Sequence, residues 1–185
     1  MCGIVGYIGK EQAAPILLEG LARLEYRGYD SAGICVAENG VLDVAKCKGR
    51  LKNLAAMTEN GALLHGTAGI GHTRWATHGE PNDINSHPHV SQNGKVALVH
   101  NGIIENYLEI REFLEEKGVQ FTSQTDSEVV AQLLEYCLGL DEVHCMQDAI
   151  YMVLHRIEGA YAFGIVCADD PERIYAARKD APLLL

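Results

Sequence analysis

The sequence predicts an α+β fold built in layers, and three observations lead to this prediction. Segments that favour β-strands occupy both ends of the chain, and the strongest helical patterns lie between them. Two β-prone runs flank Asn39-Gly40, which is typical of the tight turn of an antiparallel hairpin. Strands and helices do not alternate regularly, so a doubly wound parallel sheet is not expected.

The first part of the chain is expected to form a strand, a helix and a hairpin. An apolar run at residues 2–8 predicts a buried strand. Apolar residues recur at helical spacing over residues 12–25, which indicates an amphipathic helix with one buried face. The hairpin strands are expected at residues 31–37 and 41–47, because asparagine followed by glycine readily adopts the left-handed backbone of a two-residue turn.

The middle of the chain is expected to hold a short helix at residues 51–57 and two strands at residues 68–74 and 96–100. The loop between these two strands is polar and contains Pro81, Asn82, Asp83, Asn85, Ser86 and Pro88. Loops of this length between strands often carry function, so a lid over a binding site is expected there.

Three helices and two strands are expected in the last part of the chain. The helices fall at residues 106–117, 127–138 and 143–157, and the second and third each carry one apolar stripe that predicts packing against a sheet. The strands fall at residues 160–168 and 173–178. Because the chain closes on apolar residues without a polar tail, we expect one domain over residues 1–185 that is incomplete at its C-terminal end.

The composition is typical of one globular domain, with 185 residues of which 48% are hydrophobic. Six cysteines are scattered without Cys-x-x-Cys spacing, which favours free thiols in a reducing, cytoplasmic environment. No export signal opens the chain, and no apolar stretch approaches the ~20 residues that a membrane-spanning helix needs.

The charge distribution argues against nucleic acid and membrane surfaces as partners. The formal net charge is −10, and eleven acidic residues lie between positions 105 and 148 with only two basic ones. A negative field of this kind repels phosphate groups. The simplest interpretation of the acidic residues is that they form the solvated outer faces of helices.

Cys2 is the residue with the clearest chemical potential. If the preceding residue were removed, a thiol and a free α-amino group would share one residue. Cysteine attacks as the thiolate, and an α-amine with a pKa of about 7.7–8.0 can accept its proton near neutral pH. Taken alone, however, Cys2 is better explained as an inert residue at the start of a buried strand.

Four further residues could together bind and polarise an amino acid. Arg74 could hold a carboxylate through two parallel hydrogen bonds, and Asp126 could hold an ammonium group. Asn101 offers a side-chain amide donor and Gly102 an unobstructed backbone N–H, which is the pair needed where negative charge develops on a carbonyl oxygen. These residue types predict an amino-acid pocket with an oxyanion hole.

Each of these residues also has a simpler explanation. Asp126 falls at the start of a predicted helix, where an acidic residue interacts favourably with the helix dipole, and Thr125 with Glu128 matches a capping box. The local sequence favours this explanation. Asn101-Gly102 is commonly a hairpin turn, and Arg27 and Arg74 could be ordinary salt-bridge residues. The histidines raise the hypothesis of a metal site, since His87-Pro88-His89 brings two imidazoles close together in a loop that lies near the others in the sequence: His72, His78 and His100. No complete zinc motif accompanies them, so no metal is expected.

Taken together, the motifs resemble the glutaminase domains of class-II glutamine amidotransferases, which belong to the N-terminal nucleophile hydrolases. The resemblance covers nearly the whole chain, and residues 1–9, 23–33 and 72–79 carry it most strongly. Cys-Gly-Ile is shared with amidophosphoribosyltransferase, asparagine synthetase and glutamate synthase, whereas the two later segments resemble the glucosamine-6-phosphate synthase branch. Amidophosphoribosyltransferase is the nearest alternative.

The resemblance implies a four-layer αββα sandwich that hydrolyses glutamine to glutamate and ammonia without a cofactor. Cys2 would be the nucleophile, and its α-amine the general base. Asn101 and Gly102 would form the oxyanion hole. Arg74 would bind the α-carboxylate of glutamine, and Asp126 its α-amino group.

The same resemblance assigns supporting roles around the pocket. Thr77 and His78 would line it, Trp75 and the polar loop that follows would close over bound glutamine, and Arg27 would brace the terminal cysteine. Full-length relatives carry sugar-phosphate isomerase domains that use the ammonia to make glucosamine 6-phosphate from fructose 6-phosphate, and they are expected to be homodimers. Those domains are not in this sequence, so only the glutaminase half-reaction is expected from it.

Three hypotheses about function remain after this reasoning. The favoured one is a glutamine-hydrolysing domain with a terminal cysteine nucleophile. The second is a catalytically silent module that binds glutamine, and the third is a histidine-metal hydrolase. An assay of glutamate release distinguishes them when it is run on the parent protein and on Cys2→Ala, each with and without a chelator.

Overall fold

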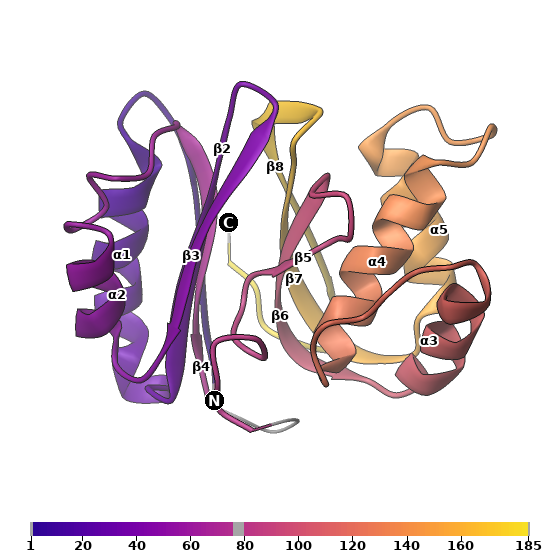
Figure 1. Cartoon of the computed structure of the whole chain (residues 1–185), viewed down its shortest axis with the longest axis horizontal. Coiled ribbons are helices and arrows are strands. Elements are labelled where there is room, and N and C mark those ends of the chain that lie inside the picture. Colours follow the sequence, from indigo (N-terminus) through magenta and orange to yellow (C-terminus); the bar gives the residue numbers. More distant parts are fainter. Residues whose placement is uncertain (1, 76–79, 185) are drawn as a thin grey trace.

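The chain folds into two four-stranded antiparallel sheets that pack face to face, with helices covering both outer faces (Figure 1). This arrangement comes from a computed structural model that describes residues 2–75 and 80–184. It is the four-layer αββα sandwich implied by the family resemblance. The α+β prediction is confirmed, because within each sheet the neighbouring strands pair in antiparallel fashion.

The first sheet and its helices come from the N-terminal part of the chain. Its strand order is β1-β4-β2-β3, with bounds Gly3–Ile8, Ala68–Arg74, Ser31–Glu38 and Val41–Lys48. Helices α1 (Ala13–Leu24) and α2 (Leu51–Met57) cover its outer face, and a 3₁₀ turn, η1 (Glu25–Arg27), follows α1. The predicted hairpin is confirmed, and Asn39 and Gly40 both have positive φ angles, of 49° and 79°.

The second sheet and its helices come from the C-terminal part. Its strand order is β5-β6-β7-β8, with bounds His89–Val90, Val96–Ile104, Gly159–Cys167 and Asp170–Lys179. Helices α3 (Tyr107–Glu116), α4 (Asp126–Leu138) and α5 (Met146–Arg156) cover its outer face. The three predicted helices are confirmed, but the two-residue strand β5 was not predicted.

Alternation along the strands decides which side chains meet between the sheets. Ile4 and Ile70 belong to an apolar cluster between the two sheets, which also contains Ala97 and Val99 of β6. The side chains of His72 and Arg74 share a face of β4 with Ile70, since residues two apart point the same way. By the same alternation Asn101 shares a face of β6 with Ala97 and Val99, so it points at the first sheet.

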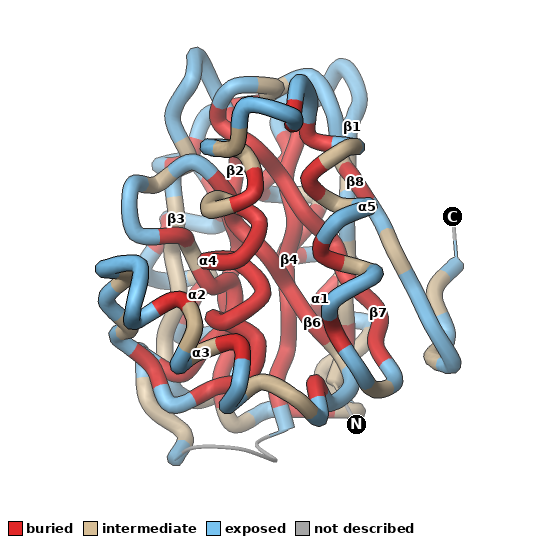
Figure 2. Tube along the Cα trace, turned by 90° about the vertical axis from the view of Figure 1, so that its right-hand side faces the viewer, coloured by how far each residue is buried: buried red, intermediate tan, exposed pale blue. Residues whose placement is uncertain are grey.

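The burial pattern agrees with this arrangement. Strand β4 is buried along its whole length, and β6 is buried from Val96 to His100 (Figure 2). A second apolar cluster joins α4 and α5 to the outer face of the second sheet and contains Leu98, Leu133 and Phe163. The polar ends of β4 and β6 therefore lie beside a buried apolar core.

Replacing Leu133 with alanine tests this core. Leu133 is 0% exposed on α4, so its truncation removes apolar contacts and leaves a cavity. We expect the free energy of unfolding, measured by urea denaturation, to fall by about 2–5 kcal/mol. Leu108→Ala is the matched control, because Leu108 is 57% exposed on α3 and its loss should change stability by less than about 0.5 kcal/mol. Equal losses in the two variants would contradict this description of the core.

Candidate active site

A cavity of about 430 Å³ is lined by Cys2, the residue just before β1, and by residues of β6 and of the start of α4. This volume falls in the range typical of small-molecule sites, about 300–1,000 Å³. Its lining includes all seven site residues expected from the sequence that the structure describes: Cys2, Arg27, Arg74, Trp75, Asn101, Gly102 and Asp126. The other two, Thr77 and His78, lie outside the described residues.

Cys2 is half-buried and held by the backbone of Trp75. Its Sγ accepts a hydrogen bond from the Trp75 N–H at 3.2 Å and lies 3.6 Å from the Trp75 carbonyl oxygen. The pairing of Gly3 with Thr73 brings Cys2 alongside Arg74 at the end of β4. Burial raises the pKa of the Cys2 thiol above its ordinary value, although the hydrogen bond from Trp75 acts in the opposite direction. The thiol therefore needs a base if it is to attack as a thiolate.

Asn101 and Gly102 lie within β6 and pair with Ala162 and Tyr161 of β7, so their alternative interpretation as a hairpin turn is wrong. The Nδ2 atom of Asn101 donates a hydrogen bond to the backbone oxygen of Cys2 at 3.4 Å. Gly102 has a φ angle of 132°, and a Cβ atom there would lie 2.0 Å from the Ala160 oxygen. Only glycine fits this position without displacing the neighbouring strand.

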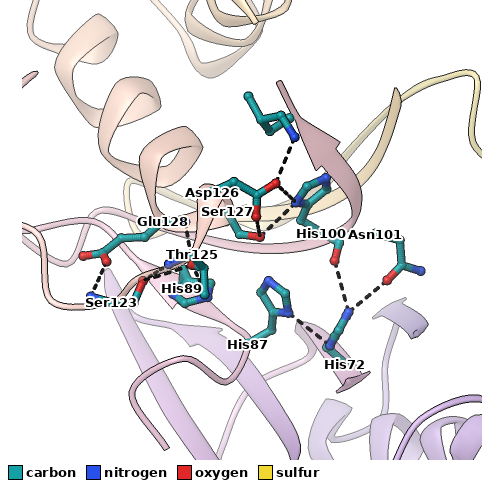
Figure 3. Close-up of polar contacts among 11 residues, drawn as sticks. His72, His87, His89, His100, Asn101, Ser123, Thr125, Asp126, Ser127 and Glu128 are labelled. Atoms are coloured by element: carbon teal, nitrogen blue, oxygen red, sulfur yellow. Dashed lines mark hydrogen bonds and ion pairs between the residues drawn. The ribbon is translucent and has the colours of Figure 1, made fainter. Parts of the chain in front are cut away.

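Arg74 and Asp126 are charged residues buried at the cavity wall, with 4% and 5% of their surfaces exposed. Asp126 Oδ2 accepts the N–H of Ile104 at 2.9 Å, and its other side-chain neighbours are Ser127 and His100 (Figure 3). A buried arginine and a buried carboxylate on one cavity wall offer complementary charges to a zwitterionic ligand.

The N-terminal cap of α4 is formed by the residues around Asp126. Thr125 is the cap residue, and its hydroxyl accepts the Glu128 N–H at 3.3 Å, as the sequence predicted. The reciprocal half of the predicted capping box is absent among the described contacts of Glu128, whose carboxylate accepts the N–H groups of Thr122 and Ser123 instead. With Thr125 acting as the cap, Asp126 is able to face the cavity.

Four histidines, His72, His87, His89 and His100, are buried beside the cavity, where the sequence had raised them only as possible metal ligands. His72 contacts Asn101 and the carbonyl of His100 through Nε2, and its Nδ1 lies 3.2 Å from Nδ1 of His87 (Figure 3). The rings of His87 and His89 are in edge contact at 4.7 Å, and His89 Nε2 lies 3.0 Å from the Thr125 hydroxyl. Burial lowers the pKa of His72 to about 3, and it lowers the pKa of His87 and His89 well below the ordinary value.

The segment that precedes β5 is anchored to β3. Lys46 donates hydrogen bonds to the carbonyl oxygens of Ile84, Ser86 and Pro88 at 3.2, 2.8 and 3.2 Å. Asn85, Ser86 and His87 are buried. The prediction that the whole polar loop acts as a lid is therefore wrong for this half of the loop, which is part of the packed interior.

Trp75 and the turn that carries Arg27 meet at the mouth of the cavity. Trp75 is 48% exposed, and its ring contacts the edge of the Tyr29 ring at a centroid distance of 5.5 Å. A Cβ atom on Gly28 would lie 2.7 Å from the backbone carbon of Arg74. The backbone of this turn thus packs directly on the end of β4, beside Cys2.

Within residues 2–75 and 80–184, no group of three histidine, cysteine, aspartate or glutamate side chains is arranged to hold a metal ion. The helices in the same part of the chain are all too short or too polar to cross a membrane.

In this antiparallel αββα sandwich, the cysteine that precedes the first strand lines a cavity at the ends of the sheets. This arrangement is characteristic of the N-terminal nucleophile class of glutamine amidotransferases. Residues 72–183 match the glutamine amidotransferase domain family. The chain belongs to this family.

Individual relatives agree with this assignment. All 185 residues align with a glutamine--fructose-6-phosphate aminotransferase [isomerizing] from Caldanaerobacter subterraneus subsp. tengcongensis at 60% identity, and with one from Clostridium tetani at 52%. The chain spans 30% of the length of each. The solved glutamine phosphoribosylpyrophosphate amidotransferase from B. subtilis, complexed with ADP and GMP, matches with a TM-score of 0.76 and 31% identity, over 91% of this chain and 35% of that one.

The buried histidines predict a specific loss of stability in acid. An unfolded histidine binds a proton below pH 6.5, whereas His72 in the folded protein does so only near pH 3. The unfolded state thus binds more protons in this window, and stability falls as the pH drops through it, by about 1.4 kcal/mol per pH unit for each proton taken up on unfolding.

His89→Gln should reduce the number of protons taken up on unfolding by about one, because it removes one buried group that becomes protonated only when the chain unfolds. The slope of stability against pH should become shallower by the same amount. Urea denaturation at several pH values between 7 and 5 measures the slope. His65→Gln is the control, since His65 is exposed and lies outside the cluster. An unchanged slope in His89→Gln would show that His89 is already charged in the folded state.

Proposed function

We propose that this chain hydrolyses glutamine to glutamate and ammonia with Cys2 as the nucleophile. The observation that carries the proposal is that Cys2, Asn101, Arg74 and Asp126 line one cavity although they lie far apart in the sequence. A nucleophile, an oxyanion donor and a pair of opposite charges are the groups that amide hydrolysis of a free amino acid requires.

Arg74 and Asp126 hold the head group of the substrate in this mechanism. The guanidinium of Arg74 binds the α-carboxylate, and the carboxylate of Asp126 binds the α-ammonium group. Both side chains are buried at the cavity wall, where reduced access of water strengthens their interactions with a charged ligand. The side-chain carboxamide of glutamine then extends toward Cys2.

Cys2 requires a proton acceptor because burial raises the pKa of its thiol. We propose that removal of Met1 exposes the α-amine of Cys2, and that this amine accepts the thiol proton. An α-amine has a pKa of about 7.7–8.0, so much of it is unprotonated near neutral pH. The thiolate then attacks the carboxamide carbon and forms a tetrahedral intermediate.

The negative charge of that intermediate is stabilised by the Asn101 side-chain amide and the Gly102 backbone N–H. Collapse of the intermediate breaks the carbon–nitrogen bond, and the leaving amine takes the proton held by the Cys2 α-amine and departs as ammonia. Water then attacks the resulting thioester while the α-amine takes one of its protons. Collapse of this second intermediate breaks the carbon–sulfur bond, and the proton on the α-amine passes to Sγ, so that glutamate departs and the thiol is regenerated. Each donor of an oxyanion hole typically contributes about 10²–10³ in kcat.

The remaining residues act around this centre. Arg27 braces Cys2, and the half-exposed Trp75 lies beside the cavity opening. Thr77 and His78 lie outside the described residues and remain predicted pocket residues.

We further propose that the ammonia is used by another part of a longer protein. The relatives that align over the whole chain are named glutamine--fructose-6-phosphate aminotransferase [isomerizing], and this chain spans 30% of their length. The natural acceptor would then be fructose 6-phosphate, with glucosamine 6-phosphate as the product. Identities of 60% and 52% to these relatives favour this acceptor over that of the B. subtilis amidotransferase, which is 31% identical.

Cys2→Ala should abolish glutamate release from glutamine, because it removes the nucleophile and leaves the head-group clamp intact. An enzymatic glutamate assay measures the loss, and isothermal titration checks that glutamine still binds. Intact-mass measurement identifies the fraction of parent protein that begins at Cys2, and activity should scale with that fraction. Full turnover in Cys2→Ala, or in protein that retains Met1, would refute the mechanism. Loss of activity on addition of a chelator would favour a metal hydrolase.

Asp126→Asn should raise KM for glutamine much more than it lowers kcat. The asparagine oxygen can still accept the Ile104 N–H, so the fold is preserved while the negative charge is lost. A hydrogen bond to a charged group is worth about 1.5–3 kcal/mol, which corresponds to a rise in KM of roughly 10- to 150-fold. Steady-state kinetics, with thermal melting as the control for folding, decides the matter. A normal KM with a collapsed kcat would contradict the clamp role.

A further inference from the structure

His72 lies at the point where the two sheets meet next to the cavity. It is 0% exposed on β4, and its ring crosses the gap to β6. Its Nε2 atom lies 2.9 Å from Oδ1 of Asn101 and 3.1 Å from the backbone oxygen of His100 (Figure 3). His72 is the buried imidazole in direct contact with the amide proposed for the oxyanion hole.

The contact with His100 determines where the proton of His72 resides. A backbone carbonyl oxygen can only accept a hydrogen bond, so Nε2 of His72 has to carry a hydrogen. That N–H can be shared only with another acceptor, so the Asn101 atom beside it is the amide oxygen. The Nδ2 group of Asn101 is thereby turned toward Cys2, whose backbone oxygen it contacts at 3.4 Å.

The other side of the ring supports the same tautomer. With a hydrogen on Nε2, a neutral His72 presents a lone pair at Nδ1. The Nδ1 atom of His87 lies 3.2 Å from this nitrogen, so it has to carry the hydrogen of that bond. His87 is then unprotonated at Nε2, which is buried and has no hydrogen-bond partner among the described residues. Burial, which lowers the pKa of both rings, keeps them neutral and so preserves this pattern of donors and acceptors.

We propose that His72 is a positioning residue that locks the Asn101 amide with its N–H groups directed at the reacting carbonyl. The inference rests on the proposed function, because it deepens the oxyanion role given there to Asn101. An asparagine amide that could rotate by half a turn would present its oxygen to the developing negative charge, and repulsion would replace stabilisation. The bond from His72 excludes that orientation, since a flipped amide would place N–H groups against N–H.

A double-mutant cycle tests the proposal. His72→Leu removes the donor, and His72→Gln keeps an N–H close to the position of Nε2. His72→Leu should lower kcat for glutamine hydrolysis by up to roughly 100-fold, the scale of losing one oxyanion donor. KM should change little, because the head group is held by other residues. His72→Gln should recover most of the lost kcat, and in an Asn101→Ala background His72→Leu should cause no further loss.

Three kinetic outcomes would overturn the proposal. They are equal losses of kcat in both backgrounds, no recovery by His72→Gln in a variant that melts like the parent, or a change confined to KM. A general packing defect would produce the first of these, which is why the cycle separates a positioning role from a structural one.

A second measurement does not depend on activity. Nitrogen-15 NMR of the parent protein at neutral pH should show His72 protonated at Nε2 and unprotonated at Nδ1. The opposite tautomer, or a doubly protonated ring, would overturn the inference whatever the kinetics. If the parent releases no glutamate but the tautomer is as expected, the proposed function fails while the bond between His72 and Asn101 stands.

Discussion

The face-to-face contact of the two sheets is the constraint on which the rest of the structure depends. Small residues between the sheets allow this close contact, among them Cys35, Ala37 and Ala97. At Gly33 even a Cβ atom would lie 2.1 Å from the His87 oxygen. Because alternate side chains of each strand point into this contact, groups at the ends of β1, β4 and β6 meet at one end of it. The cavity is the place where the apolar packing gives way to those polar groups.

Polar groups buried in such a contact are costly unless they are paired, and the histidine cluster shows how they are accommodated. Neutral imidazoles avoid the cost of burying a charge, and each can donate at one nitrogen and accept at the other. His72, His87 and His89 thus bridge the β4 strand, the segment anchored by Lys46, and the cap of α4. The same bonds that satisfy the interior also restrain Asn101 and Thr125, two residues of the cavity wall. Stability and site geometry are therefore coupled.

Much of the fold was predictable because local patterns and tertiary packing agree. The turn at Asn39-Gly40 determined the hairpin, and the predicted helix at residues 51–57 matches α2 at both ends. Strand β5 was missed because two residues inside a polar loop carry no periodic signal. Asn101-Gly102 was ambiguous, since only the pairing with β7 shows that the glycine is needed for close approach rather than for a turn.

The site was predictable to a lesser extent from residues alone. Cys2 and Asp126 each had a simpler local explanation, and it was the family resemblance that brought them together. Part of the histidine cluster follows from strand alternation. His72 lies on the same face of its strand as Ile70 and Arg74, and His87 and His89 are two residues apart in the sequence. What no local pattern contains is the contact between His72 and Asn101, which exists only because two separate sheets pack together.

In the proposed mechanism, Cys2 forms a covalent bond with the glutamyl group of the substrate. Rapid acid quenching of protein mixed with glutamine, followed by mass spectrometry of its peptides, tests this directly. We expect a glutamyl adduct on the peptide that begins at Cys2, and none on peptides that contain the other five cysteines. Turnover of glutamine without any adduct on Cys2, or with the adduct on another residue, would contradict it.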